Sequence, residues 1–302
     1  MKKKSRSSAR VPGNKGARPA SGSRGRPAEK TSVGPKSGGA RKELAKSERQ
    51  RPGTPTRARG ISTERMVVGR HAVHSFLKQR GTFCVRLHLQ NQQSDADEIV
   101  TLAREQGVDV QYQDRERLAG LAGAELVHQG FVLETRGFPY VDIEDVLDRE
   151  LVLVLDGVED PRNLGAAARA AFTLGAGALV IPARRAASVT ATAQKSAAGA
   201  LAMLDVAQVE NLGRALEKLK ASGFWLVGAE ADGATKPWEI DCRGKIALVI
   251  GGEDRGLRRL TRENCDFVTS IPMAAADFSL NAADAATVLL YEVLRQRSLG
   301  AG

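Results

Sequence analysis

Three short segments combine polar side chains that could act together on a hydroxyl group. Residues 163–169 begin with Asn163 and end with Arg169, residues 251–257 contain Glu253, and residues 271–281 end in Ser279-Leu280-Asn281. An amide, a guanidinium, a carboxylate and a hydroxyl can hold a nucleophilic oxygen close and stabilise the negative charge that develops on it. Taken singly, each segment is more simply explained as a helix cap or a charged turn.

The first segment follows an apolar run and opens a helix. Residues 151–155 predict a strand, which leads through 156–161 into Asn163, whose side-chain amide can cap the next helix. Gly165 and the alanines at 166–168 keep that helix thin enough for close approach. Arg169 follows less than two turns along the helix, where its charge would be costly to leave buried and unpaired.

The other two segments also lie at strand ends. The apolar run 246–250 predicts a strand that bends through Gly251-Gly252, where a ligand could contact bare backbone. Glu253 then stands at the carboxyl end of this strand, where it could receive a ribose hydroxyl or hold the arginine. Ile271-Pro272 is expected to end a further strand, and Ser279 and Asn281 to open the last helix.

The elements that must position these residues follow from the spacing of apolar residues. A small α/β unit of residues 64–139 is expected to end at Phe138-Pro139-Tyr140, and residues 141–149 read as a linker to a second unit of residues 150–300. In the small unit the expected elements are a helix over 68–78, a strand over 83–90, a helix over 95–106, a strand over 108–112, a helix over 115–121 and a strand over 130–135.

The second unit alternates continuous apolar strands with helices. Its expected strands are 151–155, 178–181, 224–227 and 246–250, and its expected helices begin near 164 and cover 212–221 and 282–297. This alternation favours an α/β fold with a parallel sheet covered on both faces, in which ligands bind at the carboxyl ends of strands. No GxGxxG follows any of the strands, which argues against a Rossmann-type cofactor fold.

The positive charge of the chain is concentrated at its start. Residues 1–60 hold 18 Lys and Arg against 3 Glu and no Asp, whereas the remainder holds 27 Lys and Arg against 32 Asp and Glu. With so few large aliphatic residues, segment 1–60 is predicted to be disordered. A basic arm suits nucleic acid because each phosphate that it neutralises releases counterions, although a solubilising or targeting extension has a similar composition.

Composition also excludes several kinds of site. No apolar run approaches the roughly 18 residues that span a bilayer, so we expect a soluble protein without a membrane partner. The three cysteines, Cys84, Cys242 and Cys265, are isolated, which predicts neither disulfides nor a zinc site and fits a reducing, cytoplasmic location. The four histidines form no metal-binding group, and we assign no metal.

In their order and spacing, the three segments resemble the three motifs of the SpoU (TrmH) family of RNA ribose 2′-O-methyltransferases, within the SPOUT superfamily. The resemblance covers roughly residues 66–298. Four further stretches resemble the members of the family that modify a guanosine of 23S rRNA: residues 68–73, 127–130, 258–266 and 292–297.

The resemblance implies a SPOUT-type α/β domain with a C-terminal trefoil knot, S-adenosylmethionine as methyl donor, a small N-terminal RNA-binding domain and a homodimer with its interface beside the site. Carried over by motif, the polar site positions are Asn163, Arg169, Glu253, Ser279 and Asn281. The positions whose backbone would contact the donor are Gly251, Ile271 and Leu280.

Within this site we interpret Arg169 as the group that stabilises the developing alkoxide and anchors a phosphate. The family's arginine is commonly cast as the base, but a guanidinium with a pKa above about 12 is a poor proton acceptor. Glu253, Ser279 and Asn281 would orient the arginine and the ribose, and the first proton acceptor stays open.

The chain departs from the family in two places, which bear on the RNA target more than on the chemistry. Ala282-Ala283-Asp284 follows the Ser-Leu-Asn where relatives usually carry Val-Ser or similar residues. Asp254-Arg255 precedes Gly256 where many relatives have smaller residues. We expect RNA as partner, with 23S rRNA as the target, because the shorter tRNA enzymes of the family commonly lack the small domain. Two alternatives stay open: a tRNA or another rRNA site, and a catalytically silent RNA-binding assembly factor.

Overall fold

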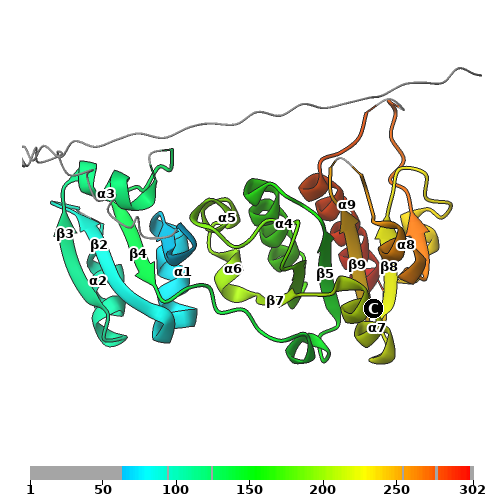
Figure 1. Ribbon diagram of the computed structural model, residues 1–302, viewed down its shortest axis with the longest axis horizontal. Helices are drawn as coiled ribbons and strands as arrows, with labels where there is room; N and C mark the ends of the chain where they lie inside the picture. The colour runs from blue at the N-terminus through cyan, green and yellow to red at the C-terminus, as the bar shows by residue number, and fades with distance from the viewer. Residues whose placement is uncertain (1–62, 94, 124, 254, 276–277, 300–302) are drawn as a thin grey trace, which may run out of the picture. The chain divides into compact units, whose positions relative to one another are not determined.

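The computed structural model describes residues 63–299 except 94, 124, 254 and 276–277 (Figure 1). The basic segment 1–60, for which we predict disorder, lies outside the described residues. Within the described part of the chain the strands form a four-stranded and a six-stranded sheet. No helix of that part is long and apolar enough to cross a membrane.

The smaller sheet is mixed. Its strands, in spatial order, are β1 (Met66–Val68), β4 (Phe131–Thr135), β2 (Cys84–Gln90) and β3 (Asp109–Gln113). β4 pairs antiparallel with β1 and β2, and β2 pairs parallel with β3. The helices of this region are α1 (Arg70–Arg80), α2 (Asp97–Glu105) and α3 (Arg115–Ala122), with short 3-10 turns at η1 (Thr63–Arg65) and η2 (Gly81–Phe83).

The larger sheet is parallel throughout, which confirms the prediction. Its spatial order is β10 (Phe267–Thr269), β8 (Trp225–Ala229), β9 (Ile246–Gly251), β5 (Leu151–Asp156), β6 (Ala178–Pro182) and β7 (Asp205–Val209). The remaining elements are α4 (Pro161–Thr173), α5 (Ala191–Ala197), α6 (Ala200–Met203), α7 (Leu212–Ala221), η4 (Pro237–Glu239), α8 (Arg259–Asn264) and α9 (Ala282–Leu299).

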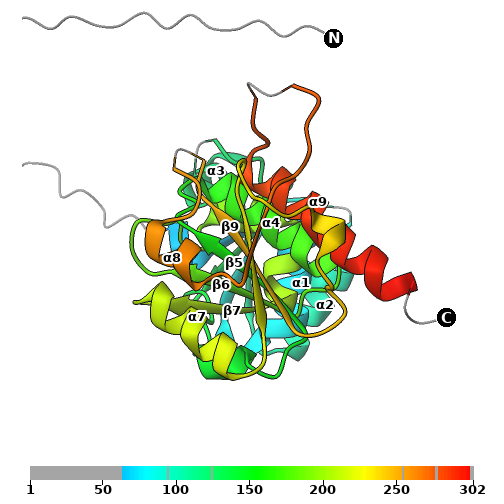
Figure 2. The same ribbon diagram turned by 90° about the vertical axis from the view of Figure 1, so that its right-hand side faces the viewer.

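Helices cover both faces of this sheet, which is why its central strands are apolar throughout. Leu151, Leu153 and Leu155 of β5 face a core shared with α4 and α9, whereas Val152 and Val154 face a core shared with α7. Figure 2 shows the strands between α4 and α9 on one side and α7 on the other. Every residue of β5 is buried, as expected for a strand covered on both faces.

The strand order places a topological switch point between β5 and β9. These strands are neighbours, with Asp156 opposite Gly251, but the chain leaves β5 toward β6 on one side and leaves β9 toward β10 on the other. The two connections therefore diverge and open a crevice at the carboxyl ends of β5 and β9. In open parallel sheets this crevice is where ligands bind.

Several predicted elements need correction. The helix expected over 68–78 is shifted, because Met66–Val68 pairs with β4 as a strand and the helix begins at Arg70 after Gly69, whose φ is +96°. The expected linker 141–149 contains the 3-10 turn η3 (Ile143–Val146), whose Ile143 and Val146 are buried against the sheet. The strand expected to end at Ile271-Pro272 ends at Thr269.

Five elements of the larger unit were not predicted: α5, α6, β7, η4 and α8. Residues 191–203 are rich in alanine, which gives no apolar period to read. The trefoil knot that the resemblance implies stays a prediction.

Candidate active site

The helix that carries the first segment begins earlier than the sequence suggested. Pro161 is its first residue, and the carboxylate of Asp160 caps it by accepting a hydrogen bond of 2.7 Å from the backbone N–H of Arg162. Proline at this position loses no hydrogen bond, since the first N–H groups of a helix have no partner within it. Asn163 therefore lies within the first turn and does not cap the helix, which leaves its side-chain amide free for another contact.

That contact joins the first two segments. The Asn163 Nδ2 donates a short hydrogen bond to Oε1 of Glu253. Asn163 follows β5 and Glu253 follows β9, so the bond crosses the switch point. The structure thus brings together two of the predicted polar site residues at the edge of the sheet where a ligand is expected.

Backbone packing of glycines shapes the loop after β9. A Cβ on Gly251 would lie 2.1 Å from the carbonyl carbon of Gly256, and a Cβ on Gly252 would lie 2.3 Å from the backbone oxygen of Gly157. The N–H of Gly256, whose φ is +61°, donates to the oxygen of Gly252 at 3.0 Å. The two glycines that we expected to face a ligand are thus also required for the closure of this loop.

A buried carboxylate fixes the same loop to the end of β5. Asp156, which is 1% exposed, accepts a hydrogen bond of 2.9 Å from the backbone N–H of Arg258. Its other oxygen lies 3.2 Å from the Arg258 guanidinium. Because a buried charge is stable only when it is paired, this contact holds the carboxyl ends of β5 and β9 in one arrangement.

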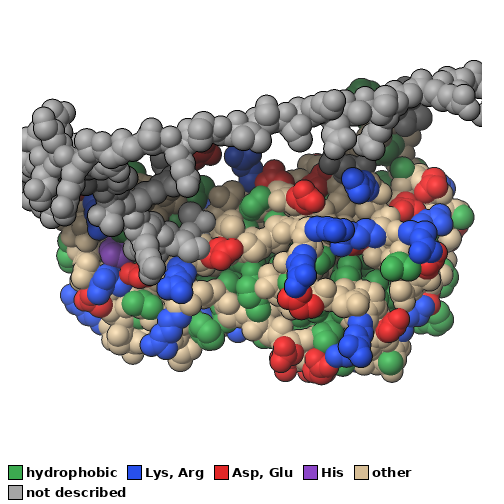
Figure 3. All heavy atoms as spheres, viewed as in Figure 1, with side chains coloured by type: hydrophobic (Ala, Val, Ile, Leu, Met, Phe, Trp, Pro, Cys, Tyr) green, Lys and Arg blue, Asp and Glu red, His purple; other side chains and the backbone are tan. Residues whose placement is uncertain are grey.

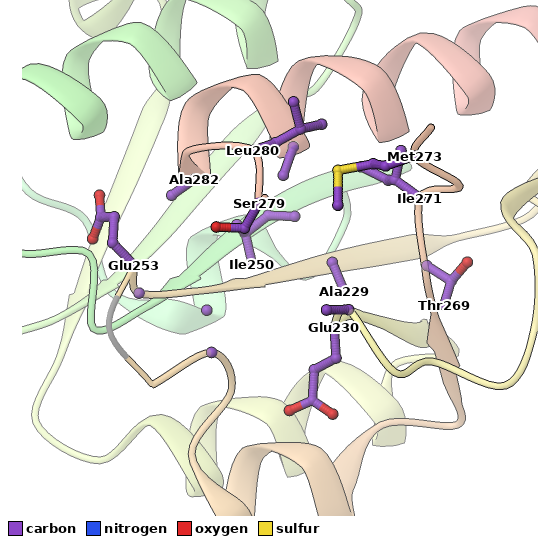
Figure 4. A pocket seen from close by; sticks show the side chains of 15 residues that line it. Ala229, Glu230, Ile250, Glu253, Thr269, Ile271, Met273, Ser279, Leu280 and Ala282 are labelled. Carbon is purple, nitrogen blue, oxygen red and sulfur yellow. The ribbon is translucent and has the colours of Figure 1, made fainter. Parts of the chain in front are cut away.

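A pocket opens beside Glu253 (Figure 4), and its atom-free space of about 800 Å³ includes open solvent. The sequence-predicted residues Gly251, Glu253, Ile271, Ser279 and Leu280 all line it. In Figure 4, Glu253 and Glu230 lie on different sides of the pocket, with Ser279 and Ile250 between them.

Sequence reasoning missed Glu230, which follows the neighbouring strand β8. Its side chain is 14% exposed, and its Oε2 accepts a hydrogen bond of 2.6 Å from Nε of Arg262. This hydrogen bond and the charge of Glu230 raise the pKa of Arg262 above its usual value. The only signal in the sequence is a carboxylate directly after a predicted strand, as at Glu253. Thr269 is a further lining residue that sequence reasoning did not single out, and Met273, which belongs to the third segment, was not assigned to the site.

Three predicted residues lie outside the lining of this pocket: Asn163, which reaches it only through its hydrogen bond to Glu253, and Arg169 and Asn281. Arg169 is exposed on α4 and, within the described ranges, has no ion-pair or hydrogen-bonding partner. Asn281 serves the start of α9: its Oδ1 accepts from the backbone N–H of Asp284 at 2.9 Å, and its Nδ2 donates to the Asp284 carboxylate at 2.7 Å. Ser279 lines the pocket with an exposed side chain.

The cysteines are not placed or ionised for nucleophilic attack. Burial raises the pKa of Cys84 and of Cys265 to about 12 and that of Cys242 to about 11, so all three remain thiols at neutral pH. All three are free. The residues that the structure describes contain no cluster of three or more potential metal ligands.

Comparison with known proteins identifies the family of the chain. Residues 150–291 match the family model of the SpoU rRNA methylase family, and residues 66–141 match that of the RNA 2′-O ribose methyltransferase substrate-binding domain. A 23S rRNA (guanosine-2′-O-)-methyltransferase RlmB of Xylella fastidiosa is 42% identical over 65% of this chain and 82% of its own. An uncharacterised tRNA/rRNA methyltransferase of a Mycobacterium species is 38% identical over 85% of this chain and 84% of its own.

The fold agrees with a solved structure that contains the methyl donor. The SpoU methyltransferase AviRb of Streptomyces viridochromogenes, in complex with the cofactor AdoMet, superposes with a TM-score of 0.66 at 28% identity, over 77% of this chain and 90% of its own. The chain therefore belongs to the SpoU family and is an RNA ribose 2′-O-methyltransferase that uses S-adenosylmethionine.

Proposed function

We propose that this enzyme methylates the ribose 2′-OH of a guanosine in 23S rRNA, and that it does so in the cytoplasm. The observation that carries the proposal is the Asn163–Glu253 hydrogen bond beside the pocket at the switch point. The name of the Xylella relative supports the choice of target. The Mycobacterium relative, named for both tRNA and rRNA, makes tRNA the second candidate.

The pocket suits the chemical parts of the proposed donor. Ile250, Ile271 and Leu280 offer apolar walls to an adenine ring, and Gly251 exposes backbone beside them. Glu230 keeps one carboxylate oxygen free of Arg262, and a carboxylate in this setting can accept hydrogen bonds from ribose hydroxyls. When bound, S-adenosylmethionine supplies a methyl group on a positively charged sulfur.

The polar residues would hold and activate the nucleophile. Glu253, fixed by Asn163, can accept hydrogen bonds at the pocket wall, and the Ser279 hydroxyl can accept or donate them, so the two can orient a ribose hydroxyl. A guanidinium is a poor proton acceptor, so we assign Arg169 to the stabilisation of the developing alkoxide and of a nearby phosphate. Asn281 would act by fixing the start of α9, next to Ser279 and Leu280.

We assign RNA binding to residues 64–139 and methyl transfer to residues 150–300. The two family-model matches and the two separate sheets support this division.

The proposed homodimer interface is the outer face of α4 and α9. These helices pack against each other, and they expose Phe172, Val288, Tyr291 and Leu294, which are between 37% and 59% exposed. Ala282 and Ala285 of α9 line the donor pocket, so an interface on α9 would lie beside the site. A second copy would remove these apolar side chains from water. Analytical ultracentrifugation of the wild type and of Tyr291→Glu tests this interface. The same mass for both proteins would contradict it.

In vitro methylation tests the function directly. Purified protein is incubated with labelled S-adenosylmethionine and either unmodified 23S rRNA or unmodified tRNA, and the products are mapped by resistance to alkaline hydrolysis, which 2′-O-methylation confers. We expect a single 2′-O-methylguanosine in 23S rRNA. Label in tRNA alone would favour the second candidate, and donor binding without transfer to either RNA would contradict the proposed function.

A further inference from the structure

A second, more polar pocket adjoins the donor pocket. It contains about 1,200 Å³ of space, including open solvent, and shares Gly252, Glu253 and Gly256 with the donor pocket. Its other lining residues are Asp156, Gly157, Glu159, Arg185, Arg255 and Arg258. The two pockets therefore meet at Glu253.

Two arginines of this polar pocket are left without carboxylate partners. Arg258 is neutralised by Asp156, but Arg185 and Arg255 are exposed and form no ion pair within the described residues. The adjacent Arg184, in contrast, pairs with Glu210 at 3.3 Å. On the face shown in Figure 3, basic and acidic side chains are interspersed. An arginine without a carboxylate partner is available to bind an anion.

The backbone that carries Arg185 is held in an unusual conformation. Its φ is +55°, in the left-handed region that residues with a Cβ seldom adopt. The carbonyl oxygen of Arg185 accepts a hydrogen bond of 3.0 Å from Nη2 of Arg258. Since Arg258 is in turn fixed by the buried Asp156, a chain of contacts ties the Arg185 backbone to the carboxyl end of β5. Strained backbone that its surroundings hold in place is often found at functional sites.

We propose that the polar pocket receives the target nucleotide of the RNA, with Arg185 and Arg255 binding the phosphates that flank the methylated ribose. This inference rests on the proposed function. The ribose must reach Glu253, where the two pockets meet, and the flanking phosphates are then within a nucleotide's length of it. A guanidinium can bind phosphate oxygens through two parallel hydrogen bonds. Glu159, also in this pocket, repels phosphate but can accept hydrogen bonds from a base.

The test compares Arg185→Ala and Arg255→Ala with the matched control Arg184→Ala in the full-length protein. Ala and Arg both carry a Cβ, so Arg185→Ala removes the charge without relieving the backbone. RNA affinity is measured against salt concentration without the donor, and donor binding is measured separately.

We expect each of the two variants to bind RNA about tenfold more weakly, equivalent to about 1.4 kcal/mol. The slope of log affinity against log salt should fall by about 0.7–0.9 for each lost phosphate contact. Arg185→Lys should retain most of the slope, because it keeps the charge. Donor affinity should be unchanged, and Arg184→Ala should match wild type.

Wild-type affinity and slope in both Arg185→Ala and Arg255→Ala would overturn this inference, as would a loss of affinity with an unchanged slope. The proposed function would still stand if wild type methylated ribose. Because the slopes are measured without the donor, they test phosphate binding even if ribose methylation were to fail.

Discussion

Replacement of Gly251 by alanine should open the loop that forms one side of the donor pocket. The added Cβ would lie 2.1 Å from the Gly256 carbonyl carbon, 2.4 Å from its oxygen and 2.5 Å from the N of Leu257, whereas ordinary contact begins at 3.4 Å. All three atoms belong to backbone, so no side chain can rotate away. The loop has to move by an ångström or more, which breaks the Gly256–Gly252 hydrogen bond.

Overpacking of this kind costs about 1–3 kcal/mol. A domain of this size loses about 2–4 °C in Tm for each kcal/mol, so we expect a clear fall in Tm. The affinity for S-adenosylmethionine should fall at least about tenfold, since a 1.4 kcal/mol loss of contacts suffices. Calorimetric titration with the donor and a thermal melt of the free protein measure both effects.

Gly244→Ala is the matched control, because a Cβ at Gly244 has no atom within 4 Å and its φ lies outside the left-handed range. It should bind the donor as wild type does. If Gly251→Ala kept its donor affinity within about threefold and its Tm within 1–2 °C, close packing of this loop would not shape the donor site.

Three further predictions concern other parts of the chain. Arg169→Ala should abolish transfer but leave donor affinity unchanged, and a single-turnover rate within about threefold of wild type would remove this arginine from the mechanism. Deletion of residues 1–60 removes a net charge of +15 and should therefore weaken RNA binding and lower the slope of log affinity against log salt. Identical slopes with and without these residues would show that the arm does not contact RNA. Arg297→Ala should lower the free energy of unfolding by about 1–3 kcal/mol, because it removes hydrogen bonds from Arg297 to the carbonyls of Glu150, Cys242 and Gly244. Arg295→Ala is the control, because it breaks only the exposed pair with Glu292, and it should lower the free energy of unfolding by less than about 1 kcal/mol in chemical denaturation. Equal losses in Arg297→Ala and Arg295→Ala would contradict the stabilising role assigned to Arg297.

The sequence predicted the central strands well because their burial on both faces leaves a continuous apolar run. The runs at 151–155 and 246–250 correspond to β5 and β9, and the helix expected over 212–221 is α7. The placement of Asn163 and Glu253 at the same edge of the sheet was also foreseeable, since both follow strands of one parallel sheet.

The order of the strands could not be read in the same way. β9 lies between β8 and β5, and this long-range arrangement is what brings Glu230 to the pocket. No local pattern marks Glu230, and no spacing reveals that Gly251 packs on Gly256. Arg169 lies outside the pocket lining, on the exposed surface of α4.

The most direct test of ribose methylation is a single-atom change in the RNA. A target RNA with a 2′-deoxy sugar at the methylated nucleotide is compared with the same RNA carrying the 2′-OH, under saturating S-adenosylmethionine, and methyl uptake is measured by mass spectrometry of the nucleosides. We expect 2′-O-methylguanosine from the hydroxyl-bearing RNA and no uptake by the deoxy RNA. Continued methylation of the deoxy RNA would place the methyl group on a base and contradict the assignment of a ribose nucleophile.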